Sequence, residues 1–199
     1  VHRVRNVLHE RDIGHLGTLD PNASGLMVLA VGSKALKIIE YFSGLSKEYI
    51  AGVRFGAVSS TYDAEGMLEP VKRKPGVPVP TTEDVRRLLI EQFTGNIEQI
   101  PPAHSAVHIA GQRAYELARK GVTVEMPTRN VEITACDILK FTYPTLKLRV
   151  ACSSGTYIRS LAHDLGRLLR CGGYLETLER TKVGKWLIED AKTIEDATW

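Results

Sequence analysis

The chain has 199 residues, of which 43% are hydrophobic and 25% are charged, and its formal net charge is +3. This composition is typical of globular proteins in water, and it excludes an intrinsically disordered chain. No segment approaches the roughly 18 consecutive apolar residues of a membrane helix, so we expect no membrane partner. We expect one self-sufficient domain with its own hydrophobic core, located in the cytoplasm.

The cysteines indicate neither a disulfide framework nor a zinc site. They are three in number, widely spaced, and form no C-x-x-C pair. Such residues usually behave as small apolar side chains, which is our expectation for Cys136, Cys152 and Cys171.

The first unusual stretch in chain order is GHLGTLDP, residues 14–21. Its two glycines and one proline predict a loop, because they interrupt both helices and strands. Asp20 precedes the proline in this loop. An aspartate there is either an ordinary turn residue or a catalytic carboxylate, and spacing alone does not decide between them.

A helix and a strand are predicted next. Residues 34–43, KALKIIEYFS, place four apolar residues on one helical face: Ala35, Ile38, Ile39 and Phe42. From Lys47, the sequence KEYIAGVRFG alternates as a half-buried strand does. Residues 59–80 contain two glycines and four prolines, which predict turns and a surface loop.

The middle of the chain predicts a helix and then an arm. TTEDVRRLLIEQF, residues 81–93, combines threonine caps and early acids with a buried stripe of Val85, Leu88, Leu89 and Phe93. Residues 100–121 open with two prolines and mix histidines with basic residues. They predict an exposed arm followed by a short helix.

Two strands and a helix are predicted in the last third. The strands are Val131–Ile138 and Leu146–Cys152, and the helix lies in TYIRSLAHDLGRLLR. Its apolar face consists of Ile158, Leu161, Ala162, Leu165, Leu168 and Leu169.

The junction CSSGTY before this helix is a candidate anion site, because the unpaired N–H groups of a helix N-terminus favour an anion. Tyr157 and Arg159 are two residues apart, so on a regular helix they diverge by about 200°. One of them would then point to the core and the other to a site. The alternative is a core Tyr157 and a surface Arg159.

Basic residues are concentrated between Lys140 and Lys185, a region that contains nine lysines and arginines but only three acidic residues. This excess is either an ordinary solvated surface or a surface that contacts nucleic-acid phosphates.

Several chemistries lack their motifs in this sequence. We find no zinc-deaminase motif, no hydrolase elbow, no P-loop and no dinucleotide fingerprint. We therefore expect no metal and no cofactor, with Asp20 as the best catalytic candidate.

The motifs together resemble the TruB-type tRNA pseudouridine synthases. GHLGTLDPNASGLMVLAVG is similar to that family's segment around its aspartate. The likeness continues in order through SKEY, TYDAEG, IPPAHSAVHIAGQRAYELARKG, SSGTYIRSLAHDLG and LERTKVG. The resemblance implies an α+β pseudouridine synthase fold, with a mixed central β-sheet flanked by helices and an active cleft across the sheet.

By this resemblance the protein would isomerise the tRNA T-loop uridine, position 55, to pseudouridine. Asp20 would be the essential carboxylate, as a nucleophile or as a base. Arg159 would pair with it and hold it ionised, and Tyr49 would stack on the target base. Leu178 would form the apolar wall of the pocket, supported by Tyr157.

The resemblance also implies the RNA contacts. His15 would fill the gap left in the RNA when the target base flips out. Residues 100–128, the thumb segment, would clasp the tRNA T-arm stem-loop through three basic residues: Arg113, Arg119 and Lys120. The basic 140–185 region would line the same face. We expect a monomer that needs no guide RNA.

Residues 1–199 would thus form one catalytic domain, with the thumb segment inserted in it. Leu16 and Asn22 depart from the family pattern, and both could alter the packing of the loop. The Lys-Pro-x-Gly block expected upstream of Val1 and the C-terminal RNA-binding domain of some members lie outside this chain. We expect truncation at both ends.

Three interpretations of function follow. The first is a stand-alone tRNA uridine isomerase, and the second is the guide-RNA-dependent branch related to dyskerin. The third is a non-catalytic RNA-folding module on the same surface. The thumb segment favours the first over the second, and the presence of Asp20, Tyr49 and Arg159 argues against the third.

Overall fold

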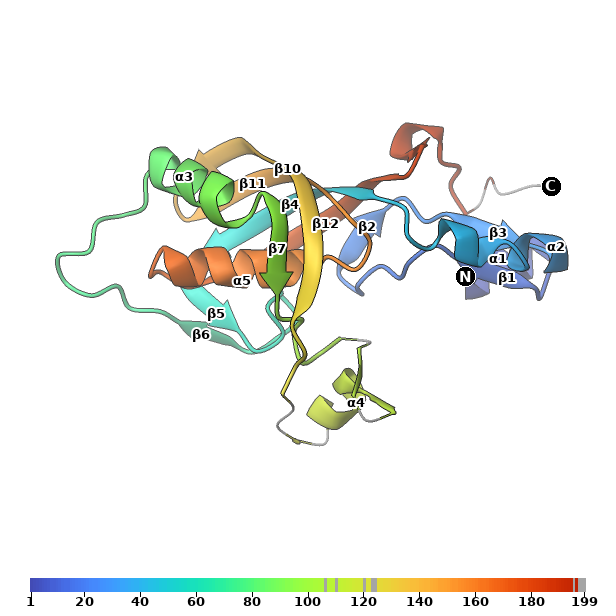
Figure 1. Cartoon of the computed structure of the whole chain (residues 1–199), viewed down its shortest axis with the longest axis horizontal. Coiled ribbons are helices and arrows are strands. Elements are labelled where there is room, and N and C mark those ends of the chain that lie inside the picture. Colours follow the sequence, from blue (N-terminus) through green and yellow to red (C-terminus); the bar gives the residue numbers. More distant parts are fainter. Residues whose placement is uncertain (106, 110, 120, 123–124, 195, 197–199) are drawn as a thin grey trace.

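A mixed seven-stranded sheet forms the centre of the computed structural model, which describes residues 1–105, 107–109, 111–119, 121–122, 125–194 and 196 (Figure 1). Six strands follow the order β13-β12-β4-β11-β10-β7, each antiparallel to its neighbour, and β2 pairs parallel to β12. Their bounds are β2 (Ala23–Gly25), β4 (Lys47–Phe55), β7 (Gly95–Gln99), β10 (Arg129–Thr142), β11 (Thr145–Cys152), β12 (Gly173–Val183) and β13 (Trp186–Leu187).

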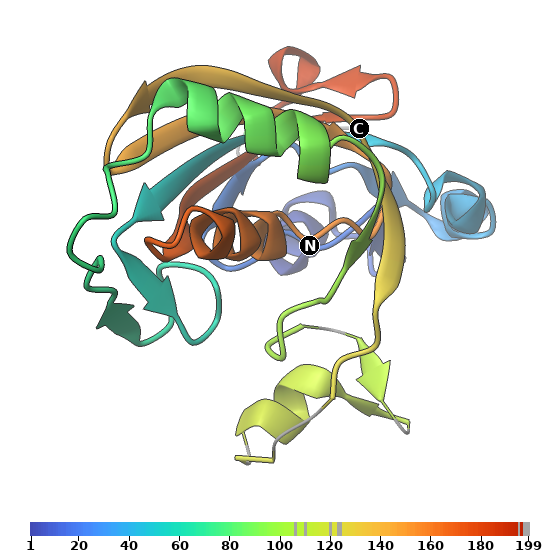
Figure 2. The ribbon, with the colours of Figure 1, turned by 60° about the vertical axis from the view of Figure 1, so that its left-hand side comes forward.

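Two helices, α3 (Thr82–Gln92) and α5 (Ile158–Leu168), cover one face of this sheet (Figure 2). Their apolar faces join the alternate side chains of β4 and β11 in one core. At about 25 cal/mol per Å² of apolar surface, this burial supplies the main driving force for folding. The opposite face is polar, because every second residue of β11 from Thr145 to Arg149 is exposed.

The strongest sequence predictions are confirmed. In β4, Tyr49, Ala51, Val53 and Phe55 are all buried. The helix α3 begins at a capping box between Thr81 and Asp84, in which each side chain binds the other residue's backbone N–H. The predicted β10, β11 and α5 are also present, and Cys152 and Cys171 are buried while Cys136 packs against the core.

The prediction of one helix over residues 34–43 is wrong. The structure has α2 (Ser33–Leu36) and then a 3₁₀ turn, η1 (Ile39–Phe42). This break places the side chains of Leu36 and Ile39 against Gly14. A Cβ added to Gly14 would lie 2.8 Å from each of the two side chains. Ile38 and Phe42 of the expected apolar face stay exposed, because tertiary packing selects a different pair.

The N-terminal region contributes α1 (His2–Leu8) and the antiparallel pair β1 (Ile13–His15) and β3 (Leu29–Val31). The loop that carries Asp20 connects β1 to β2. Directly after β13, the chain forms a short 3₁₀ turn, η2 (Ile188–Asp190).

Residues 59–80 are only partly the surface loop that we expected. A hairpin of β5 (Ala57–Ser59) and β6 (Leu68–Pro70) encloses a turn in which Asp63 is buried. The thumb segment contains β8 (His108–Ile109), β9 (Gln112–Arg113) and the expected short helix, α4 (Ala114–Arg119). In both views α4 stands away from the sheet (Figures 1 and 2).

Candidate active site

The structure brings Asp20 and Arg159 together across 139 residues of sequence. Arg159 Nε lies 2.8 Å from Asp20 Oδ2, and Nη2 donates to Oδ1 at 3.1 Å. This two-point contact fixes the orientation of the carboxylate as well as attracting it. The partner of Asp20 in this contact is the Arg159 side chain, whereas the Tyr157 N–H at the start of α5 donates to Gln99.

Arg159 is buried and is bound from several sides. Its side chain is 7% exposed, whereas that of Asp20 is 33% exposed. Nη1 lies 3.4 Å from Oδ2 of Asp63, and the carbonyls of Thr61 and His104 accept from the guanidinium at 3.2 Å. Arg159 is thus a buried cation with several partners, and Asp20 is the partner that stays accessible.

Asp63 is a second carboxylate of this site, and no pattern in the sequence singled it out. Its side chain is 3% exposed and accepts hydrogen bonds from Thr61 Oγ1 and the backbone N–H of Glu65. Asp63 lies in the TYDAEG block. That block was noted only for its resemblance, because a turn rich in polar residues does not reveal that one carboxylate turns inward.

Tyr49 lies on β4 beside this site and is 8% exposed. Burial raises the pKa of its phenol, and the negative charge of Asp20 adds to that effect, while the charge and a hydrogen bond of Arg180 lower it. Because the net direction is upward, Tyr49 keeps its proton at neutral pH.

The other two residues expected in the pocket are Leu178, which lies on β12, and Tyr157, which lies at the start of α5. Leu178 is 7% exposed and pairs with Ala23 and with Ala51. Tyr157 is the half-buried N-cap residue of α5 and precedes the helix. The 200° divergence expected of Tyr157 and Arg159 therefore does not apply, because only Arg159 is helical.

The start of α5 is fastened to the root of the thumb segment. The Gln99 side chain accepts from the Tyr157 N–H at 2.9 Å and donates to the Tyr157 carbonyl at 3.1 Å. Ser160 Oγ donates to the Ile100 carbonyl at 2.7 Å. These contacts hold the turn that carries Arg159.

Two of the expected RNA-contacting residues are exposed on short strands. His15 is exposed at the end of β1, and Arg113 is exposed on β9, where its guanidinium lies 6.0 Å from the Tyr115 ring. Arg119 ends α4, but its side chain lies outside the described residues, as does Lys120.

The basic 140–185 region does not form one surface. Arg159 and Arg180 are buried, and Arg149 makes an ion pair of 2.7 Å with Asp137. Arg167 lies 3.5 Å from Asp164. Five further basic residues of this region are exposed: Lys140, Lys147, Arg170, Lys182 and Lys185. The excess of charge therefore divides between the interior, local ion pairs and open surface, because strands and helices send neighbouring residues to different faces.

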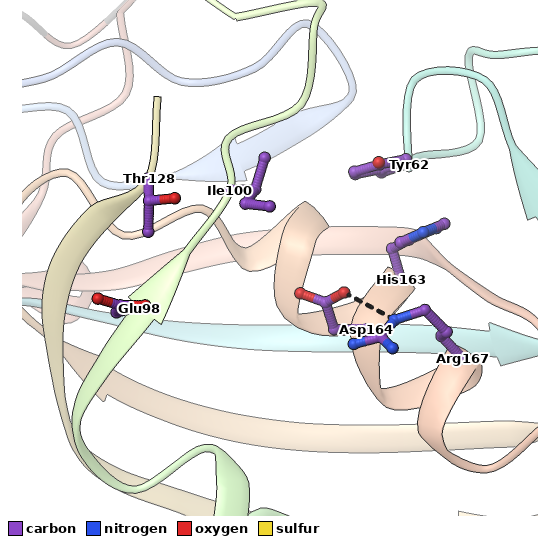
Figure 3. A pocket seen from close by; sticks show the side chains of 7 residues that line it. All are labelled: Tyr62, Glu98, Ile100, Thr128, His163, Asp164 and Arg167. Atoms are coloured by element: carbon purple, nitrogen blue, oxygen red, sulfur yellow. Dashed lines mark hydrogen bonds and ion pairs between the residues drawn. The ribbon is translucent and has the colours of Figure 1, made fainter. Parts of the chain in front are cut away.

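A cavity of about 410 Å³ lies beyond Arg159 along α5 (Figure 3). His163, one turn after Arg159, stacks on Tyr62 with ring centres 3.9 Å apart and planes 10° apart. The other lining residues come from α5, β7 and both ends of the thumb segment: Glu98, Ile100, Thr128, Asp164 and Arg167. No motif in the sequence indicated this cavity.

Within the described residues, no group of three or more histidines, cysteines and acids is placed to hold a metal ion. None of the helices in that same part of the chain combines the length and apolar character needed to cross a membrane.

Solved structures share this fold. "Crystal Structure of a Cbf5-Nop10-Gar1 Complex" aligns with a TM-score of 0.68 at 24% identity over 92% of this chain and 44% of that one. "Structure of H/ACA RNP bound to a substrate RNA containing 2'-deoxyuridine" aligns with a TM-score of 0.67 at 23% identity, over 97% and 45%. The expected α+β pseudouridine synthase fold is confirmed.

The chain belongs to the TruB family. Residues 5–158 match the model for TruB family pseudouridylate synthase (N terminal domain). The chain is 42% identical over 193 residues to tRNA pseudouridine synthase B of Francisella tularensis subsp. novicida, covering 97% of this chain and 63% of that protein. The Clostridium kluyveri protein of that name is 40% identical over 195 residues, covering 98% and 65%. The chain therefore spans less than two thirds of these relatives.

Proposed function

We propose that the protein isomerises a uridine in the T-loop of tRNA, uridine 55, to pseudouridine. The observation that carries this proposal is the Asp20 carboxylate, which a buried Arg159 holds at two atoms and which remains one third exposed. It stands within GHLGTLDP, in a chain that belongs to the TruB family. The named relatives support tRNA as the substrate.

The reaction exchanges one bond for another. The bond from the ribose C1′ to N1 of uracil breaks, the base turns, and C1′ bonds to C5. C5 loses a proton and N1 gains one, so the atoms of substrate and product are the same. Arg159 holds the Asp20 carboxylate in a fixed orientation, in which it acts as a nucleophile or as the base that removes a sugar proton.

The residues around the pair form a place for one flipped base. Tyr49 stacks on the base and stays protonated, so its O–H is available as a donor. Leu178 supplies an apolar wall, and Tyr157 supports the pocket from the start of α5. These roles are consistent with the burial of Tyr49 and Leu178, with the electrostatic effect of Asp20 on Tyr49, and with the accessibility of the Asp20 carboxylate.

The proposal also includes contacts between the protein and the RNA around the target uridine. Flipping a uridine out of a folded loop leaves a gap, and the exposed His15 would fill it. The thumb segment would hold the T-arm through its basic residues, which include Arg113. The enzyme would act as a monomer in the cytoplasm, without a guide RNA, a metal or a cofactor.

The test is formation of pseudouridine in unmodified tRNA transcripts incubated with the purified protein alone. Chemical labelling followed by site mapping should place the product at uridine 55. Asp20→Asn should abolish it, whereas the control Asp137→Asn should retain it, because Asp137 is an exposed carboxylate bound to Arg149.

Two results would contradict the proposal. Full activity of Asp20→Asn would remove Asp20 from the mechanism. Activity that appears only when a guide RNA is added would move the protein to the guide-dependent branch.

A further inference from the structure

Arg180 is a buried arginine to which neither the sequence analysis nor the mechanism above gives a role. It lies on β12 within LERTKVG and is 1% exposed. Its guanidinium donates to the carbonyls of Leu26 at 2.8 Å, Gly17 at 3.2 Å and Thr18 at 3.4 Å. These carbonyls lie on both sides of Asp20 in sequence, so one side chain holds both ends of the loop that carries the carboxylate.

The main chain of Arg180 holds the same loop. In the parallel pair β2–β12, Arg180 lies opposite Gly25, and its carbonyl accepts from the Leu26 N–H at 2.8 Å. Gly25 has φ +100°, and a Cβ there would lie 2.4 Å from the Arg180 carbonyl oxygen. This close approach needs glycine, because any side chain would push β2 away from Arg180.

Arg180 also faces the second residue of the proposed site. It is the register partner of Tyr49 in the antiparallel pair β4–β12. Burial raises the pKa of the Tyr49 phenol, and the charge and hydrogen bond of Arg180 oppose this rise. Arg180 therefore joins the loop of Asp20 to the strand of Tyr49.

We propose that Arg180 is a positioning residue that fixes the Asp20 loop against Tyr49 for the chemical step. This inference rests on the proposed function. The burial of a guanidinium among carbonyls is costly and is offset only if the carbonyls stay in place. The arrangement therefore resists movement of the loop, so that Arg180 sets the position of the loop backbone while Arg159 holds the Asp20 carboxylate.

Lysine is a suitable substitution for separating position from charge. It keeps a buried cation, but it has one donor group on a flexible stem, in place of the planar fork that reaches three carbonyls. An error of about 1 Å in the place of a catalytic group costs about 100-fold in rate. Arg180→Lys should therefore leave the fold intact and slow the chemical step.

The experiment compares wild type, Arg180→Lys, Arg180→Met and the control Arg54→Met, all as the full chain. Arg54 is an exposed arginine on β4 that lies 3.6 Å from Glu176, far from the Asp20 loop in the sheet register. For each protein the thermal midpoint, the Kd for unmodified tRNA and the single-turnover rate of pseudouridine formation at saturating enzyme are measured.

We expect Arg180→Lys to keep the Kd and to lose about 100-fold in the single-turnover rate. Arg180→Met should lose at least as much, and Arg54→Met should match wild type in both quantities. A folded Arg180→Lys with the wild-type rate would overturn the inference, as would equal losses in affinity and rate, which indicate general damage to the structure. If wild type itself makes no pseudouridine, the proposed function fails, and that result is distinct from a failure in the variants alone.

Discussion

The substitution Asp63→Asn tests whether the contribution of an ion pair to the stability of this protein depends on its burial more than on the distance between its charges. Asp63 and Arg159 are 3% and 7% exposed, and their closest charged atoms are 3.4 Å apart. Asparagine keeps the shape of the side chain but removes its charge. Arg159 then stays buried with Asp20 as its remaining carboxylate partner in these contacts.

Breaking a buried pair by removing one partner typically costs about 3–5 kcal/mol, because the other charge stays desolvated. We expect the free energy of unfolding to fall by about 3 kcal/mol, the lower end, since Asp20 still compensates Arg159. For a chain of this length, that loss lowers the thermal midpoint by about 6–12 °C. Urea unfolding followed by circular dichroism measures the change.

The matched control is Asp137→Asn. Its pair with Arg149 is shorter, at 2.7 Å, but the two side chains are 49% and 48% exposed. Water screens such a pair, so its loss should change stability little. If Asp137→Asn destabilised the protein as much as Asp63→Asn does, the argument from burial would be refuted.

Four further predictions concern Tyr49, Cys136, Asn22 and the thumb segment. Burial raises the pKa of the Tyr49 phenol, so this phenol ionises at a lower pH in the unfolded chain than in the folded protein. The free energy of unfolding should therefore fall above about pH 10, and Tyr49→Phe should reduce that fall in urea titrations. Burial also raises the pKa of Cys136 to about 12, so iodoacetamide at pH 8 should label it slowly until denaturant is added. Within the described residues, the buried amide atoms of Asn22 have no hydrogen-bond partner, and Asn22→Leu should raise the free energy of unfolding by about 1 kcal/mol. Replacing the thumb residues Arg113, Arg119 and Lys120 together by alanine should weaken tRNA binding and reduce the slope of log K against log salt by about 2–3. An unchanged slope would count against phosphate contacts in the thumb segment.

The sequence predicted those helices and strands in which the buried residues follow the regular spacing of apolar residues. The strand β4 alternates strictly, and α3 carries both its cap and its apolar stripe, so each could be recognised without knowledge of its partners. By contrast, residues 34–43 form two short helices, because Gly14 on another strand selects Leu36 and Ile39 as the packed pair.

The site was predictable only through its motifs. Asp20 and Arg159 were candidates from the residues alone, their pairing followed from the family resemblance, and the structure brings them into contact. Asp63 and Arg180 were missed, because a charged residue in a polar stretch normally faces water. Their burial depends on partners far away in sequence: Asp63 on Arg159, and Arg180 on the carbonyls of the Asp20 loop.

The root of the thumb segment and the Arg159 guanidinium form one mechanical unit. The His104 carbonyl accepts hydrogen bonds from both Nη1 and Nη2 of Arg159, and Gln99 grips the peptide of Tyr157 two residues earlier. A displacement of residues 99–104 would therefore move hydrogen-bond partners of α5 and of the Arg159 guanidinium, which contacts Asp20. The alignment of the carboxylate thus depends on the backbone at the start of the thumb segment.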